Sequence, residues 1–453
     1  MSSNVRDMTK GSPVGLILMF ALPLMLGNVC QQLYVMVDTA VVGKFIGVEA
    51  LAAVGSTGWP AWLVLSVAQG LTQGFGIMIA QAFGAGDKKL MHKSYMNSIY
   101  LSIAITAVLM VVSQIIIMPM LRLLGTEETI LDMCALYIRI YYAGLPLMVA
   151  YNLFACVLRA LGNSKTPLYA MISASFTNIA LDLIFVLIFK WGIGGAAFAT
   201  VIAQGVSAAF CLVHLLKIDI LKAEKDEKNA DLRLSGQLLK LGTPVAFQNI
   251  VICVGGMVVQ KIINSYGLAV IAGFAAMNQL YGLLEIAATS FGFSLTTYVG
   301  QNIGAKQYAR VRHGTNTGAV LAFIVSLIIA ALLVVFAKPI MKMFIDISTP
   351  LGLETLDIAV KYLYIQCATL FFLYLLYIYR SALQGMGDTF IPMVSGIVEL
   401  LMRVGVALFL PLVFADGIFF AESAAWFGAA VLLCVSYYAK VHKLPRTNQR
   451  QPQ

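Results

Sequence analysis

Twelve long apolar runs follow one another along this chain, and no other feature of the sequence restricts its fold as strongly. Each run covers about 20 residues or more, which as a helix crosses a hydrocarbon core about 30 Å thick. Lipid offers the backbone no hydrogen-bonding partner, so a spanning segment must be a helix or a strand of a closed barrel. The alternating pattern of a barrel strand is missing from the sequence. We therefore predict an all-α polytopic membrane protein, with twelve transmembrane helices near residues 14–43, 51–84, 94–118, 132–160, 167–190, 194–217, 238–263, 270–302, 315–337, 357–384, 390–413 and 417–440.

Charged residues are scarce and unevenly distributed. They make up 11% of the 453 residues, against about 25% in an average soluble domain. The formal net charge of +9 raises the question of nucleic-acid binding, but the basic residues gather in alternate short loops, as the positive-inside rule requires. We therefore predict no nucleic-acid partner. The expected location is the cell (plasma or inner) membrane, with many passes through the lipid bilayer and both termini in the cytoplasm.

The two halves of the chain repeat each other. Pro23-Leu-Met-Leu-Gly-Asn28 corresponds to Pro244-Val-Ala-Phe-Gln-Asn249, and Leu158-Arg-Ala-Leu-Gly-Asn163 corresponds to Leu383-Gln-Gly-Met-Gly-Asp388. The two offsets, 221 and 225 residues, are nearly equal. Six helices in each half bring the chain back to the same side, so the repeats are parallel and related by an axis along the membrane normal.

This repeat predicts two pseudo-symmetric six-helix bundles. We expect an N-terminal six-helix lobe at residues 1–218, a cytoplasmic linker at 219–236, and a C-terminal six-helix lobe with a short cytoplasmic tail at 237–453. Transporters built in this way bind substrate between or within the halves, near the middle of the membrane. A duplicated channel or scaffold is the alternative that the repeat alone leaves open.

The sequence carries no motif for catalysis or for a resident cofactor. Its seven cysteines have no paired spacing, its four histidines form no metal-binding motif, and a GxxxxGK[ST] phosphate loop is missing. We predict a protein that is not an enzyme and acts as a monomer. We expect no cofactor, and no metal other than Na⁺ at a coupling site.

Four motifs resemble the multidrug and toxic compound extrusion (MATE) family. They are Val37-Asp-Thr-Ala-Val-Val-Gly43, Ala80-Gln-Ala-Phe-Gly-Ala85, Arg159-Ala-Leu-Gly-Asn-Ser-Lys-Thr-Pro167 and Asn178-Ile-Ala-Leu-Asp182. The resemblance implies a secondary antiporter that exports drug-like, often cationic, organic compounds in exchange for inward Na⁺ or H⁺. A flippase for lipid-linked saccharides has a similar overall build and is the alternative. It is expected to bury more basic residues than this sequence does.

Two carboxylates in the first half fall inside predicted membrane helices. Burying such a group costs a few kcal/mol, so it is a functional candidate. Asp38 lies toward the outer end of its helix and Asp182 about eight residues before Lys190, and we place both roughly 12–14 Å below the outer surface. Asn178 is one turn from Asp182, and Thr200 lies six residues into the next helix, at a depth of about 9 Å. We predict that these four residues converge on a coupling cation, as the resemblance also implies.

The second half departs from this pattern. The positions that match Asp38 and Asp182 are Val259 and Ala407, neither of which binds a cation. That half instead carries Glu285, Glu399 and Arg403, for which we predict a role in substrate contact or gating. Glu399 and Arg403, one turn apart, are expected to form an ion pair. In the first half Tyr34, one turn before Asp38, is a further candidate for substrate contact.

Overall fold

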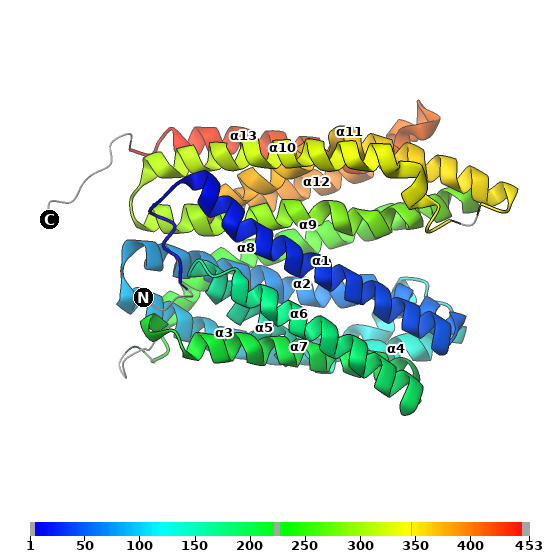
Figure 1. Cartoon of the computed structure of the whole chain (residues 1–453), viewed down its shortest axis with the longest axis horizontal. Helices are drawn as coiled ribbons and strands as arrows, with labels where there is room; N and C mark the ends of the chain where they lie inside the picture. Colours follow the sequence, from blue (N-terminus) through cyan, green and yellow to red (C-terminus); the bar gives the residue numbers. More distant parts are fainter. Residues whose placement is uncertain (1–4, 222–226, 228, 346, 446–453) are drawn as a thin grey trace. The chain divides into compact units, whose positions relative to one another are not determined.

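The computed structural model describes residues 5–221, 227, 229–345 and 347–445. Long helices account for most of these residues, as the apolar runs predict (Figure 1). The helices are α1 (Pro13–Phe45), α2 (Val48–Ala85), α3 (Lys88–Leu123), α4 (Glu128–Ala143), α5 (Leu145–Ala160), α6 (Lys165–Asp182), α7 (Gly192–Leu216), α8 (Leu232–Ile263), α9 (Leu268–Gly304), α10 (Tyr308–Met341), α11 (Pro350–Gly385), α12 (Phe390–Phe409) and α13 (Ala421–Val441).

Among the described residues, eleven helical segments are long and apolar enough to cross a membrane, or twelve if one bent pair forms a single span. The bent pair is α4 and α5, which meet at Gly144 with an angle of 49°. The expected single helix at 132–160 is therefore broken. Leu145 and Pro146 restart the helix, and a proline is well tolerated in a first turn, where the missing N–H has no helical partner.

The described residues form two compact units. Unit 1 contains Leu22–Ile250 and the N-terminal residues up to Lys10, and unit 2 contains Gly11–Ala21 and the chain from Val251 onward. Two helices therefore contribute to both units. The first turns of α1 belong to unit 2, where the Ser294 hydroxyl donates to the Ile17 carbonyl at 3.0 Å. The first turns of α8 belong to unit 1, and its last turns to unit 2.

The repeated motifs form the same turn in both halves. Gly162 and Gly387 have φ values of 80° and 83°, in the left-handed region that glycine adopts without steric cost. The next residue of each motif then caps the following helix: the Asn163 side chain accepts from the Thr166 N–H at 3.0 Å, and the Asp388 side chain from the Ile391 N–H at 3.2 Å. The sequence repeat thus preserves a helix stop followed by a helix start.

The GxxxG spacing in α2 marks a close helix crossing, as small residues do in membrane proteins. A Cβ atom on Gly74 would lie 2.2 Å from the Cα of Gly242, and one on Gly70 would lie 2.4 Å from the Cα of Ala246. No side chain fits into such a gap. The first turns of α8 are therefore packed backbone to backbone against α2, within unit 1.

We predict that Gly74→Ala destabilises unit 1, because its methyl group must push α8 away from α2. The expected loss is about 1–3 kcal/mol, as for other overpacked sites, measured by thermal unfolding of the detergent-purified protein. Gly55→Ala is the matched control in the same helix, since a Cβ there meets no atom within 4 Å. Equal unfolding temperatures for the Gly74 variant and the parent protein would contradict the close crossing.

Candidate functional site

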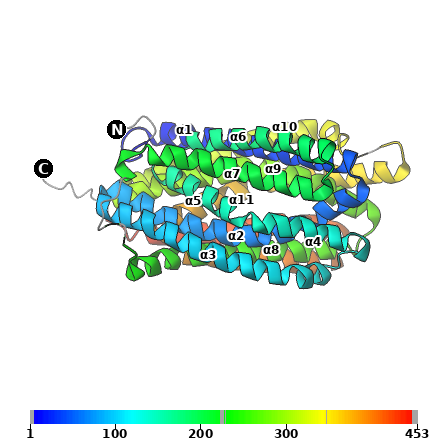
Figure 2. The ribbon, with the colours of Figure 1, turned by 90° about the horizontal axis from the view of Figure 1, so that it is seen from below.

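The four predicted cation-site residues lie on three helices of unit 1. Asp38 is on α1, Asn178 and Asp182 are on α6, and Thr200 is on α7. Helices α6 and α7 pack side by side along their length (Figures 1 and 2). Asp182 is the last residue of α6, and a π-helical segment, Leu183–Ile188, follows it directly. Such segments are rare and occur frequently at functional sites.

The carboxyl groups of Asp38 and Asp182 lie close enough to interact directly with each other. Asp38 is 7% exposed and Asp182 is fully buried. The structure therefore brings together the two acids that share a predicted depth in the sequence. Two ionised carboxylates in contact repel each other, so the pair favours a proton or a metal cation between them.

Four buried oxygen atoms at this place lack a donor. Asp38 Oδ1, Asn178 Oδ1 and both carboxylate oxygens of Asp182 receive no hydrogen bond from any N–H or O–H group of the described residues. The Asn178 amide nitrogen donates instead to the Thr200 hydroxyl, at 3.5 Å. This hydrogen bond orients the Asn178 amide and leaves the Asn178 Oδ1 atom without a donor. Buried polar atoms are rarely left unpaired. An all-oxygen set suits a hard cation such as Na⁺, and a carboxylate can also take up a proton.

Two tyrosine side chains, Tyr34 and Tyr137, lie within electrostatic reach of both acids. Tyr34 interacts with the side chains of Gln31 and Gln204 and lies within electrostatic reach of both Asp38 and Asp182. On α4, the rings of Tyr137 and Tyr141 stack with centroids 6.4 Å apart.

Tyr137 also lies within electrostatic reach of Tyr34 and of both aspartates. Tyr34 is a candidate predicted from the sequence, whereas the tyrosine pair on α4 is not. The spacing of Tyr137 and Tyr141, one helical turn, is the sequence feature from which their contact could have been predicted.

Unit 2 holds a second group of buried charges, with different pairs from those expected. Glu399 pairs with Arg380 of α11 rather than with Arg403, and the Arg380 side chain is 9% exposed. Arg403 pairs with Glu422 of α13 at 2.8 Å. The expected Glu399–Arg403 pair is therefore wrong: residues one turn apart can meet, but partners on neighbouring helices satisfy both charges better here.

Glu285 of α9 completes this group and has no basic partner among the ion pairs of the described residues. The Tyr377 hydroxyl donates to its carboxylate, and the Arg380 guanidinium lies 5.6 Å from the centre of the Tyr377 ring. Three carboxylates and two guanidinium groups thus leave one negative charge in excess. Val259 and Ala407, which replace the two aspartates of the first half, are both buried apolar residues of unit 2.

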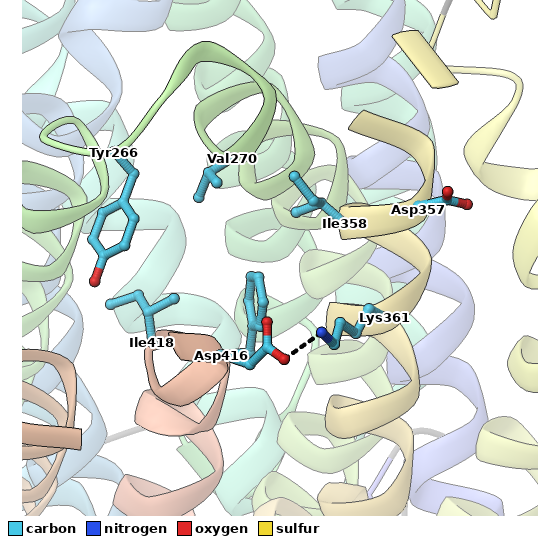
Figure 3. A pocket seen from close by; sticks show the side chains of 8 residues that line it. Tyr266, Val270, Asp357, Ile358, Lys361, Asp416 and Ile418 are labelled. Atoms are coloured by element: carbon cyan, nitrogen blue, oxygen red, sulfur yellow. Dashed lines mark hydrogen bonds and ion pairs between the residues drawn. The ribbon is translucent and has the colours of Figure 1, made fainter. Parts of the chain in front are cut away.

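Unit 2 also contains a cavity of about 260 Å³ near the start of α9. Figure 3 shows the Lys361 ammonium directed toward the Asp416 carboxylate, with which it forms an ion pair. None of the predicted site residues lines this cavity, whose walls are formed by Tyr266, Val270, Asp357, Ile358, Lys361, Asp416, Ile418 and Phe419.

A family model described as MatE matches the chain twice, over residues 23–184 and 244–409, once in each half. The chain belongs to the MATE family. It is therefore a membrane transporter of a multidrug efflux family and not an enzyme. The two matched segments begin 221 residues apart, which agrees with the offset of the Pro23 and Pro244 motifs.

Similar proteins support this assignment. A probable multidrug resistance protein of Bacillus subtilis, YoeA, is 31% identical over 77% of this MATE chain and 76% of its own length. YpnP of the same organism is 33% identical over 67% of this chain and 68% of its own length. A crystal structure of MATE in complex with MaL6 shares the fold, with a TM-score of 0.91, 22% identity, and coverage of 99% of this chain and 100% of the other.

We predict that Glu399→Gln destabilises this MATE protein by about 3–5 kcal/mol, because it leaves the buried Arg380 charge without its carboxylate. Thermal unfolding in detergent measures the loss. The double variant Arg380→Met with Glu399→Met is expected to recover most of it, because both charges are then removed together. A single variant that unfolds at the parent temperature would contradict the pairing.

Proposed function

We propose that this MATE protein is a secondary antiporter that exports drug-like, often cationic, organic compounds in exchange for inward Na⁺ or H⁺. The supporting observation is the group of four buried acceptor oxygens on Asp38, Asn178 and Asp182, which receives no hydrogen bond from the described residues. In this proposal Asp38, Asp182 and Asn178 bind the coupling cation. Thr200 orients the Asn178 amide through their hydrogen bond.

The reason for coupling is electrostatic. With both carboxylates ionised, unit 1 holds negative charge inside the membrane, at a cost of several kcal/mol. A cation that enters the site removes this cost and favours whichever conformation draws α1 toward α6. Asp38 is on α1, which contributes to both compact units, so a movement of α1 changes unit 1 and unit 2 together. A ligand shifts such an equilibrium only through its differential affinity for the two states.

The oxygen set is compatible with either ion. Two carboxyl groups in contact readily share one proton, whereas the added amide oxygen and second carboxylate suit the coordination of Na⁺. MATE has been crystallised in a bent and in a straight conformation. We infer that α1 of this chain can likewise be bent or straight near Pro23, a residue inside that helix.

We propose different roles for the remaining predicted residues. Tyr34, Tyr137 and Tyr141 offer aromatic faces beside the acids, and such faces attract organic cations. The excess carboxylate Glu285 attracts cationic substrate into unit 2. Glu399 and Arg403, each in its own ion pair, keep α11, α12 and α13 together while the protein changes conformation, which is a gating role.

Location and assembly complete the proposal. The distribution of basic residues favours cytoplasmic termini and a place in the plasma or inner membrane. One chain contains both halves of the repeat, so we propose that the monomer is the working unit.

We predict that Asp38→Asn abolishes gradient-driven efflux, lowering the initial rate at least about tenfold, because neutralising the acid removes the negative charge that attracts the cation. The assay is dye efflux from proteoliposomes, with a Na⁺ gradient and a pH gradient imposed separately. Asp132→Asn, an exposed acid on α4, is the matched control. Undiminished efflux by the Asp38 variant under both gradients would remove the proposed site.

A second prediction separates Glu285 from the coupling site. Glu285→Gln is expected to raise KM for a cationic dye about tenfold, the effect of losing roughly 1.4 kcal/mol of binding energy, with little change in KM for an uncharged substrate. An equal change for both substrates would argue against charge recognition by Glu285. Residual exchange at saturating dye would distinguish this variant from Asp38→Asn.

A further inference from the structure

Helix α4 carries an arginine on its exposed side. The residues of that side are Asp132, Leu136, Arg139 and Ala143, all of them exposed, and their spacing of three or four residues places them on one face of the helix. The opposite side of α4 packs into the hydrophobic core of unit 1. Arg139 therefore lies on the outside of unit 1, away from the two acids of the candidate cation site.

The neighbouring surface of α3 faces lipid. Val111 and Ile115, one turn apart on α3, are 63% and 70% exposed, as apolar side chains of a membrane helix are where they meet lipid tails. Gln114 lies between them and is exposed as well, and its Nε2 donates to the Arg139 carbonyl at 3.1 Å. Helices α3 and α4, which pack together (Figure 2), thus present two polar residues on a lipid-facing surface.

The helix lengths indicate how deep Arg139 lies in the membrane. Helices α4 and α5 have 16 residues each, and the bent pair spans about 45–50 Å, roughly 8–10 Å more at each end than a hydrocarbon core of about 30 Å. Arg139 lies eleven residues after Glu128, at which α4 begins, and so about 16 Å along the helix. Its backbone is therefore about 6–8 Å inside the hydrocarbon layer.

A contact with α7 gives a second measure of this depth. A Cβ atom added to Gly194 would lie 3.4 Å from Cδ1 of Ile140, so the residue after Arg139 is level with Gly194. Gly194 comes three residues after Trp191, which is 52% exposed, and tryptophan is enriched at the boundary between lipid tails and water. Arg139 is therefore about one helical turn, or about 5 Å, below that boundary. The two measures agree.

Arg139 has no acidic partner in the part of the chain that the structure describes, where the ion pairs involve other residues. Asp132 shares its face of α4 but lies two turns away, about 10 Å along the helix. A guanidinium group in hydrocarbon without a counter-charge is costly. A long arginine side chain near the edge of the hydrocarbon can extend to the headgroup level, and guanidinium groups bind phosphate oxygens bidentately.

We propose that Arg139 binds the headgroup phosphate of a phospholipid, in the leaflet where α4 begins, which we assign to the outside. The guanidinium reaches up to the phosphate and takes two of its oxygens. Gln114 retains a second amide N–H and a carbonyl oxygen for further hydrogen bonds to the headgroup. The acyl chains of this lipid lie on the apolar surface formed by Val111 and Ile115. This inference does not depend on the proposed antiport.

Native mass spectrometry of the purified full-length protein tests this site. The delipidated protein in detergent is titrated with phosphatidylglycerol and, separately, with a diacylglycerol that has the same acyl chains and no phosphate. We expect the lower Kd for phosphatidylglycerol. Arg139→Gln is expected to raise that Kd about tenfold, the effect of losing roughly 1.4 kcal/mol, and to leave the Kd for diacylglycerol unchanged.

Arg122→Gln is the matched control, because Arg122 is an exposed arginine in the last turn of α3, and this variant should bind both lipids as the parent does. An unchanged Kd for phosphatidylglycerol in Arg139→Gln, or an equal increase in both variants, would overturn the proposal. Without phospholipid, Arg139→Gln should unfold at the parent temperature. A lower temperature would show that Arg139 serves contacts within the protein, and would also overturn the proposal.

Discussion

The contact between Asp38 and Asp182 is the interaction on which the rest of this account depends. In unit 2, two buried arginines each meet an opposite charge: Arg380 pairs with Glu399 and Arg403 pairs with Glu422. In unit 1 two buried acids meet each other instead, beside an amide oxygen that lacks a donor. Such an arrangement is costly unless a proton or a metal cation neutralises it, and we propose that this requirement links ion entry to conformation.

The two halves share their backbone plan but differ in chemistry. The turns at Gly162 and Gly387 have matching geometry. In the second half, however, Val259 and Ala407 occupy the positions that match the two aspartates. Unit 2 places its charges on α9, α11, α12 and α13, where most are neutralised in pairs. The duplication thus provides two similar scaffolds, of which the first is suited to a travelling cation and the second to a stable charge network.

Much of this structure could be predicted from the sequence, because lipid imposes length and hydropathy on each helix separately. The shared depth of Asp38 and Asp182 likewise followed from residue counting along two helices. Contacts that depend on how helices pack could not be derived in this way. The Arg380–Glu399 and Arg403–Glu422 pairs join residues of different helices, whose distance is set by packing, and the break at Gly144 lies within a run of suitable length and composition.

The most direct test of the central claim counts the ions that leave the protein when substrate binds. The purified protein, with no ion gradient present, is saturated with a cationic dye. A pH indicator measures the released H⁺, and a Na⁺ electrode measures the released Na⁺. The account predicts release of one of these ions by the parent protein and none by the Asp38→Asn, Asp182→Asn double variant. Equal release by both proteins, or no release of either ion by the parent, would contradict it.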